Sequence, residues 1–292
     1  MDVYKIINHV PCRLLTWGNP FCSDGKDIIL CITGNPGILD FYHEFGLALY
    51  KRTGLPVCVV GQAGHEIIPN EKPRVLKDEK HLFDLEAQIE HKLDLINNII
   101  DKKSNLHLIG HSIGAWLIIE SLDKHPSLIN RVSSINLLFP TIQEMADTKN
   151  GRYLNKVLRK FQNVLVLFLV LLNLLPMFVL KHIAIVYLRL NSLPSNYCTR
   201  VLKYVDPIII EKVLYLAFCE MDTVTKLNVQ GITKIKHLTN VIYGESDGWV
   251  PLKYMADLEQ FQPHIKLTKV PYSHDFVLKS SRDVADMLTH RK

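Results

Sequence analysis

Residues 106–114 read Leu106-His107-Leu108-Ile109-Gly110-His111-Ser112-Ile113-Gly114. The run at 106–109 is apolar enough for a short buried strand, and the apolar residues at 115–119 predict that a helix follows the turn. The pattern G-x-S-x-G in this setting is typical of a nucleophile elbow, where a sharp turn lifts a serine hydroxyl clear of the sheet. The sequence therefore predicts Ser112 as a nucleophile, flanked by the elbow glycines Gly110 and Gly114. The alternative is a glycine-serine turn that performs no chemistry.

Short apolar runs with β-branched residues recur along the chain and predict further strands. The runs lie at 28–33, 55–60, 106–109, 132–138, 238–243 and 265–270. Between the second and third runs, apolar residues recur every three to four positions from Leu82 to Ile100, as in an amphipathic helix. Alternating strands and helices indicate an α/β fold with a mostly parallel central sheet flanked by helices. The stretches at 3–7 and 13–17 predict an antiparallel hairpin at its edge.

The positive charge of the chain belongs to one segment. The net charge is +5, and nine basic residues with no acidic residue lie between Asp147 and Asp206, so the rest of the chain is acidic. This distribution argues against a nucleic-acid partner. At 292 residues the chain is long enough for one large α/β domain or two small ones.

The six cysteines are scattered, with neither paired nor metal-binding spacing. Cys31 and Cys58 lie inside predicted strands and are expected to be small core residues. The first residues lack the charged start and apolar run of a secretory signal, and no N-x-S/T glycosylation acceptor occurs. These features predict a reducing compartment that faces the cytosol, and no metal site.

Residues 161–180 form an uncharged apolar run of twenty residues. The length allows a transmembrane helix, but a single crossing would place Ser112 and any catalytic partners after the run on opposite sides of a bilayer. Asn173 and Pro176 interrupt the run, as expected for a bent or broken hairpin. Basic residues flank it, which favours insertion into an anionic lipid interface. A buried cap helix and a true span remain the alternatives.

The run lies inside a long insertion between two predicted strands, which divides the chain. Residues 1–145 and 229–292 are predicted to form the core, and residues 146–228 a helical hydrophobic cap. We refer to residues 146–228 as the cap throughout.

Two motifs after the cap supply candidates for an acid and a base. Asp247 follows the predicted strand at 238–243, and His274 follows the last strand. Because the carboxyl ends of parallel strands meet at one edge of a sheet, both side chains are expected beside Ser112. The order serine, acid, histidine is the order of this type of site. The alternatives are a surface turn for Asp247 and an ordinary loop histidine for His274.

Other acids and histidines compete for these roles less well. Glu245 and Asp275 share loops with the favoured pair, whereas Glu220 and Asp222 lie in helical surroundings. The histidines that could approach the same edge of the sheet are His65, His111 and His264.

An oxyanion hole requires two backbone N–H groups. Ile113 directly follows the nucleophile and is expected to supply one of them. The loop Gly34-Asn35-Pro36-Gly37 follows the strand at 28–33 and is expected to supply the other. Proline has no N–H, so Asn35 is the better candidate. The alternative is that this loop is merely a tight turn.

With these residues assembled, the chain resembles the lipid droplet-associated hydrolase family, a branch of the α/β-hydrolases. The Gly-Asn-Pro-Gly loop and the segment Phe139-Pro140-Thr141-Ile142 are the most specific matches. The remaining matches are Phe41-Tyr42, Ala63-Gly64-His65, Gln88-Ile89-Glu90-His91-Lys92, the elbow with Leu108 and Ile109, Asn150-Gly151-Arg152, Tyr243-Gly244, Asp247, Trp249-Val250-Pro251 and His274. Similarity covers nearly the whole chain, although the middle matches in hydrophobicity more than in residues.

The resemblance implies an α/β-hydrolase fold and a serine esterase or lipase-like site with Ser112 as nucleophile, Asp247 as acid and His274 as base. It implies neutral lipid esters as substrates, cholesteryl esters among them. It also implies association with lipid droplets and the cytosolic face of the endoplasmic reticulum membrane through residues 149–203 or so.

Two other functions remain open at this point. The apolar cap is a stronger lipid-binding signal than a soluble esterase needs, so the chain could be a droplet surface protein with a structural role and weak catalysis. The same three residues would also serve an acyltransferase, which differs from a hydrolase only in the acceptor. No dinucleotide or phosphate-binding loop occurs, so no cofactor is expected.

Overall fold

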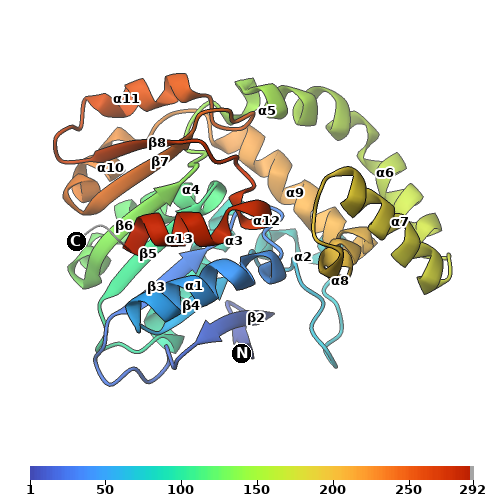
Figure 1. Cartoon of the computed structure of the whole chain (residues 1–292), viewed down its shortest axis with the longest axis horizontal. Coiled ribbons are helices and arrows are strands. Elements are labelled where there is room, and N and C mark those ends of the chain that lie inside the picture. Colours follow the sequence, from blue (N-terminus) through green and yellow to red (C-terminus); the bar gives the residue numbers. More distant parts are fainter. Residues whose placement is uncertain (290–292) are drawn as a thin grey trace.

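The computed structural model of the chain describes residues 1–289, which form an eight-stranded sheet with helices on both faces (Figure 1). In spatial order the strands run β1-β2-β4-β3-β5-β6-β7-β8. Their bounds are β1 Asp2–Ile7, β2 Val10–Trp17, β3 Ile28–Ile32, β4 Val57–Val60, β5 Leu106–His111, β6 Val132–Leu138, β7 Thr239–Gly244 and β8 Lys266–Val270. The strands from β4 to β8 are parallel, and β1 and β2 form the predicted antiparallel hairpin at one edge.

Each predicted strand is present, and most bounds lie within two residues of the prediction. The largest difference at a strand start is in β2, which begins at Val10 rather than 13. Strand β4 begins at Val57 rather than 55. Pro56 precedes it, and a proline lacks the N–H that a ladder position needs. The α/β fold with a mostly parallel sheet is therefore confirmed.

Strands β3 and β4 at the centre of the sheet are buried on both faces because they are apolar on both faces. All five residues of β3 are buried. Ile28, Leu30 and Ile32 belong to the core on one face, whereas Ile29 and Cys31 belong to the core on the other. Successive side chains of a strand point to opposite faces, so a continuous apolar run is what such a strand requires.

The helices divide between the two faces. Those of the described chain are α1 His43–Thr53, α2 Leu76–Glu79, α3 Leu85–Asp94, α4 Ile113–Lys124, α5 Lys149–Tyr153, α6 Arg159–Leu172, α7 Met177–Leu190, α8 Cys198–Leu202, α9 Pro207–Thr223, α10 Val229–Ile235, α11 Ala256–Glu259, α12 Phe276–Lys279 and α13 Ser281–Thr289. Helices α1, α12 and α13 contribute to the core on the face of Ile29, and α3, α4 and α10 to the core on the face of Leu30. The periodic segment at 82–100 forms α3 and a following π-helical turn, Leu95–Ile99.

The cap folds into the helices α5 to α9, and its apolar run is broken near its end. Helix α6 ends at Leu172 and α7 begins at Met177, so the break falls at Asn173 and Pro176 as predicted. Of the 14 residues of α6, Leu169 alone is buried. The interpretation of this run as a buried cap helix is therefore wrong, since a buried helix would place most of its apolar side chains against the core.

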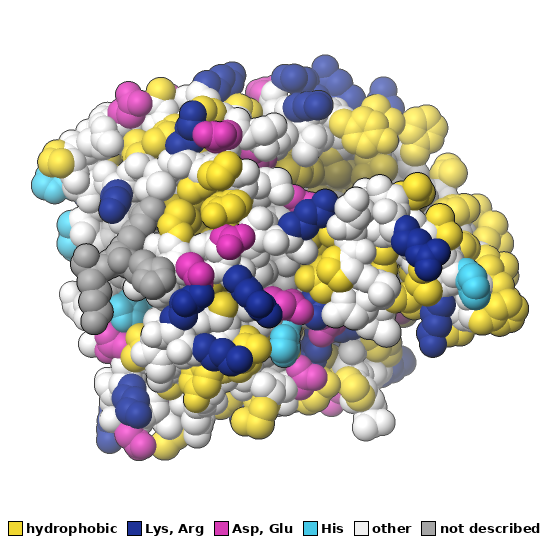
Figure 2. Space-filling view, viewed as in Figure 1, with side chains coloured by type: hydrophobic (Ala, Val, Ile, Leu, Met, Phe, Trp, Pro, Cys, Tyr) yellow, Lys and Arg dark blue, Asp and Glu magenta, His cyan; other side chains and the backbone are white. Residues whose placement is uncertain are grey.

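Large apolar side chains instead cover the outer surface of α6 and α7. Figure 2 shows hydrophobic side chains gathered at the end of the molecule where these two helices lie. Those that are exposed are Phe161, Val164, Leu167, Phe168, Val170, Leu171, Met177, Phe178, Ile183, Val186, Tyr187 and Leu190. We call this set the apolar surface of the cap. Within residues 1–289, each helix falls short of the length and apolar character that crossing a membrane requires.

Candidate active site

Ser112 lies at the sharp turn between β5 and α4, where the backbone is held in an unusual conformation. Its φ of 56° and ψ of −123° are rare for a residue with a side chain. The neighbouring strand holds this geometry, since the Ser112 N–H donates to the carbonyl oxygen of Leu138 in β6 at 3.0 Å. The turn has the strand-to-helix geometry that the sequence predicts for an elbow.

The two flanking glycines are required by close backbone approach. A Cβ at Gly114 would lie 2.4 Å from the carbonyl oxygen of Ile32, and a Cβ at Gly110 would lie 2.7 Å from the backbone of Ala115. Both distances are far shorter than a carbon atom allows, so any side chain at either position would force the elbow to move.

The structure brings Ser112, His274 and Asp247 into one line of hydrogen bonds. His274 Nε2 lies 2.9 Å from Ser112 Oγ, and His274 Nδ1 lies 2.8 Å from Asp247 Oδ2. A carboxylate only accepts hydrogen bonds, so Nδ1 carries the proton and Nε2 is left to accept from the serine hydroxyl. This is the geometry of a serine nucleophile beside a base that an acid orients.

Asp247 is held in place by its own loop after β7. Its Oδ1 accepts from the backbone N–H groups of Trp249 and Val250, at 2.7 and 3.0 Å, and its side chain is fully buried. The competing acid Glu245 points away, since half of its side chain is exposed and it lies 3.6 Å from Lys269. Asp247 is therefore the carboxylate of this loop that faces His274.

The remaining competitors take other partners. Asp275 accepts from the hydroxyl of Ser273, and Asp222 pairs with Arg159 on the surface. His65 Nδ1 donates to the carbonyl oxygen of Pro36 at 2.9 Å. Each of these side chains thus has a contact that turns it away from Ser112 Oγ.

The two candidate oxyanion donors lie where the sequence predicts them. Ile113 is the first residue of α4, and Asn35 follows β3, the strand beside β5. Among residues 1–289, neither backbone N–H has a hydrogen-bond partner.

His111 and Tyr42 form a buried connection that the sequence did not reveal. His111 Nε2 lies 2.9 Å from the carbonyl oxygen of His274, so Nε2 donates and Nδ1 accepts. Tyr42 Oη then donates to Nδ1 at 2.6 Å and accepts from the N–H of Gly34 at 3.0 Å. Burial lowers the pKa of His111 to about 3, which keeps the ring neutral as this pattern requires. The connection joins the loop after β3, the elbow and the loop of His274.

A second buried group explains part of the motif Gln88–Lys92. Lys92 is fully buried in α3, and its Nζ donates to Gln62 Oε1 at 2.8 Å and to Gln88 Oε1 at 3.0 Å. Burial lowers the pKa of Lys92 to about 7. Gln62 Nε2 in turn donates to the carbonyl oxygen of Thr33 at 2.7 Å, directly before the loop of Gly34. Lys92 of the motif thus holds Gln62, and Gln62 in turn contacts the residue directly before the loop.

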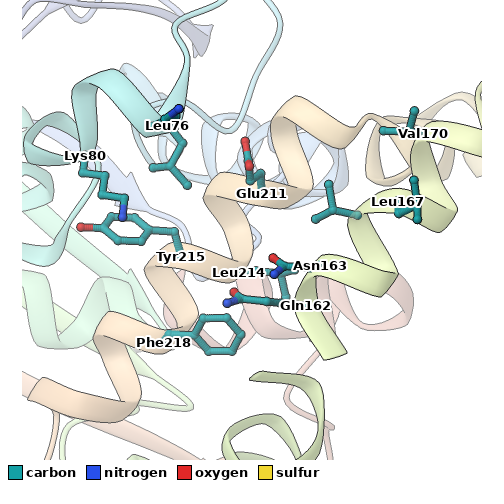
Figure 3. Close-up of a pocket in the computed structure, with 12 residues that line it drawn as sticks. Leu76, Lys80, Gln162, Asn163, Leu167, Val170, Glu211, Leu214, Tyr215 and Phe218 are labelled. Atoms are coloured by element: carbon teal, nitrogen blue, oxygen red, sulfur yellow. The ribbon is translucent and has the colours of Figure 1, made fainter. Parts of the chain in front are cut away.

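A surface groove of about 630 Å³ lies elsewhere, between α6, α9 and α2 (Figure 3). Its walls carry Leu167 and Val170 from α6 and Leu214 and Phe218 from α9, with Lys80 beside the ring of Tyr215. None of the three aligned side chains lines it. Among the described residues there is also no group of His, Cys, Asp or Glu side chains arranged to hold a metal ion.

Comparison with known proteins agrees with this architecture. A serine hydrolase from Cycloclasticus zankles superposes with a TM-score of 0.66 at 15% identity, covering 99% of this chain and 96% of that one. A meta-cleavage product hydrolase from Pseudomonas fluorescens gives a TM-score of 0.65 at 14% identity, with 98% and 96% covered. At such low sequence identity, the structural similarity establishes the fold alone, which is the α/β-hydrolase fold.

Sequence relatives are more informative. The lipid droplet-associated hydrolase of Drosophila melanogaster is 35% identical over 97% of this chain and 95% of its own length. The human protein of the same name is 32% identical over 90% and 83%. The family model described as lipid-droplet associated hydrolase matches residues 25–277, which include the elbow, Asp247 and His274. The chain therefore belongs to the lipid droplet-associated hydrolase family.

Proposed function

We propose that this protein hydrolyses neutral lipid esters, cholesteryl esters among them, at the surface of lipid droplets. The observation that carries the proposal is the line of hydrogen bonds from Ser112 through His274 to Asp247, with distances of 2.9 and 2.8 Å. A hydroxyl beside a neutral imidazole whose tautomer is fixed by a buried carboxylate is an activated nucleophile.

The first half of the reaction forms an acyl-enzyme. Ser112 Oγ attacks the ester carbonyl while His274 Nε2 takes the hydroxyl proton, and the Asp247 carboxylate stabilises the imidazolium that results. The carbonyl oxygen becomes an oxyanion that the N–H groups of Ile113 and Asn35 bind. Collapse of this intermediate breaks the ester bond, and the alcohol leaves with the proton from His274.

The second half regenerates the enzyme. Water attacks the acyl carbonyl and gives a proton to His274, and the oxyanion forms in the same place. The bond to Ser112 Oγ then breaks, the serine recovers its proton, and the carboxylic acid leaves. The fixed orientation of His274 serves both halves because the same nitrogen accepts and returns the proton.

The apolar surface of the cap supports a lipid surface as the place of reaction. Residues 149–203 combine this surface with exposed basic side chains such as Lys160, Lys181 and Arg189. Apolar side chains favour the acyl region, and cationic ones favour anionic headgroups beside it. The names of the relatives, lipid droplet-associated hydrolase, support the droplet as the location. Our proposal also includes the cytosolic face of the endoplasmic reticulum membrane.

A fluorophosphonate probe tests the site directly, because it reacts with activated serines. We expect wild-type protein to be labelled and Ser112→Ala to be unlabelled, with faster labelling when lipid droplets are present. Ser133→Ala is the matched control, since Ser133 is exposed on β6 and should leave labelling unchanged. Equal labelling of wild type and Ser112→Ala would refute the assignment of the nucleophile.

The apolar surface of the cap also favours a second function, a structural role on droplets with weak catalysis. The two functions separate in cells that contain droplets. A structural protein would alter droplet number or size equally as wild type and as Ser112→Ala, whereas a hydrolase would lose the effect with the serine. Removing residues 161–180 should abolish localisation under either function.

A further inference from the structure

Helix α9 of the cap lines a surface groove with one face and is buried on the other. Glu211, Leu214, Tyr215 and Phe218 recur at helical spacing and line the groove against α6 (Figure 3). Ile209, Val213, Leu216 and Glu220 recur on the other side and are buried. The helix therefore lies between α6, which carries much of the apolar surface of the cap, and the interior of the hydrolase core.

On the inner face, Glu220 contacts the candidate oxyanion loop. The carboxyl group is 2% exposed, and its Oε1 accepts from Asn35 Nδ2 at 2.9 Å. The same Nδ2 donates to the carbonyl oxygen of Val213, also in α9, at 3.1 Å. Both acceptors of this amide nitrogen thus come from a single helix of the cap.

The rest of the loop is held by the core. Tyr42 accepts from the N–H of Gly34, and His65 donates to the carbonyl oxygen of Pro36. Neither bond constrains the Asn35 side chain directly. The position of Asn35, whose backbone N–H is free, therefore depends on α9 in a way that the positions of its neighbours do not.

The carboxyl group of Glu220 is suited to this contact because it is uncharged. Burial raises its pKa to about 8, so it is mostly protonated at neutral pH. An ionised carboxylate next to Asn35 would repel the negative charge that develops on an oxyanion. A neutral carboxyl oxygen accepts the amide hydrogen bond without that penalty.

We propose that Glu220 is a positioning residue, which holds Asn35 so that its backbone N–H is aimed at the oxyanion. The proposal rests on the hydrolase function proposed above, and it adds that the cap contributes to the catalytic geometry as well as to lipid contact. Glu220 acts through Asn35 and has no contact with the substrate.

The test uses two substitutions of similar volume at position 220. Glu220→Gln keeps a neutral oxygen acceptor, and Glu220→Met removes it. With a soluble p-nitrophenyl ester we expect Glu220→Met to lower kcat about 10- to 100-fold, somewhat less than loss of an oxyanion donor itself. KM should stay within about 3-fold, and Glu220→Gln should keep kcat within about 3-fold of wild type. Glu211→Ala is the control, because Glu211 is exposed on the same helix.

Amide hydrogen exchange of residues 34–38 provides a readout that does not depend on activity. We expect faster exchange of the Asn35 side-chain amide, whose Nδ2 donates to Glu220 Oε1, in Glu220→Met and wild-type exchange in Glu220→Gln. Equal kcat and equal exchange in all three proteins would overturn the proposal, as would an equal loss of kcat in both variants.

Two further results separate the possible failures. If Glu220→Met does not fold, Asn35→Ala removes the same hydrogen bond from the loop side, and an unchanged kcat in that variant overturns the proposal. If wild type hydrolyses the ester no faster than Ser112→Ala, the hydrolase function fails, and the exchange at Asn35 still decides whether Glu220 holds the loop.

Discussion

Strand β3 in the central sheet and the helix pair α6–α7 are both rich in apolar residues but place them in opposite surroundings. All five residues of β3 are buried, whereas α6 buries one of its 14. Strand β3 buries its apolar side chains away from water, and this burial stabilises the fold. The helix pair leaves them exposed, which is unfavourable in water and favourable against an apolar phase.

This difference suggests a division of work between the core and the cap. The core carries the aligned side chains of Ser112, His274 and Asp247, and the cap carries the exposed apolar surface that we propose contacts lipid. The two regions meet at the contact between Glu220 and Asn35, which joins residues 185 positions apart. Four predictions test how far the two regions act independently.

The largest effect is expected from Asp247→Asn, which alters the core alone. An amide at this position favours the wrong tautomer of His274, so kcat on a soluble ester should fall by about 10⁴-fold. Binding to lipid droplets should be unchanged. Glu245→Gln is the control, since that carboxylate is exposed in the same loop and should keep full activity. A fall of less than about 10-fold would mean that Asp247 does not orient the base.

In the cap, a large effect on lipid binding is expected from the double substitution Phe168→Ser and Leu171→Ser in α6. Both side chains are more than half exposed, so stability should change little. Each contributes about 1–2 kcal/mol if an apolar phase covers it. Binding to emulsified neutral lipid, measured by flotation, should therefore weaken about 30- to 1,000-fold while kcat on a soluble ester stays constant.

The control for this double substitution is Ile6→Ser, which removes an equally exposed apolar side chain from β1 in the core. It should leave flotation unchanged. If Ile6→Ser weakened lipid binding as much, the apolar surface of the cap would have no special role and the comparison between the two regions would fail.

A moderate effect on kcat and on the thermal midpoint is expected from Tyr42→Phe, which tests the buried connection in the core. Loss of the hydroxyl leaves the N–H of Gly34 and Nδ1 of His111 without their partner. Two unsatisfied buried groups cost about 1–3 kcal/mol each, so the thermal midpoint should fall, and kcat should fall about 10-fold. Tyr4→Phe, at an exposed position on β1, should change neither quantity. Unchanged kcat in Tyr42→Phe would show that this connection does not support catalysis.

The smallest effect concerns how stability depends on pH through Glu220, at the contact between the cap and the core. Burial raises the pKa of Glu220 from 4.5 to about 8. Between these values the folded state keeps a proton that the unfolded chain releases, so the free energy of unfolding decreases as pH rises from about 4.5 to 8. A glutamine does not titrate, so the free energy of unfolding of Glu220→Gln does not decrease in this way. The thermal midpoint of wild type, relative to that of the variant, should therefore be lower at pH 8 than at pH 5 by about 3 °C or more. A constant difference would contradict a buried, protonated Glu220.

Much of the fold was predictable because it depends on local patterns. Apolar runs of strand length, the turn at Gly110–Gly114 and the helix after it each follow from neighbouring residues. Asp247 and His274 could be placed at the same edge of the sheet because the carboxyl ends of parallel strands meet there. The prediction of the break at Asn173 and Pro176 likewise required only the local chemistry of proline.

What the sequence could not reveal are contacts between distant buried side chains. Tyr42 and His111 are 69 positions apart, and Lys92 and Gln62 are 30 apart. Nothing in a local pattern distinguishes a tyrosine that supports a loop from one that fills the core, because the distinction lies in which polar atoms face it. The motifs around these residues were visible in the sequence, but their purpose was not.

By itself, the sequence determined the α/β class, the identity and order of the residues at the candidate site, and the presence of an apolar cap. These are consequences of side-chain periodicity and of turn chemistry, which act over a few residues. Only the tertiary structure decided that α6 presents its apolar side chains outward and that α9 reaches Asn35 through Glu220. Both depend on which face of a helix packs against the core, and that choice is made by the whole fold.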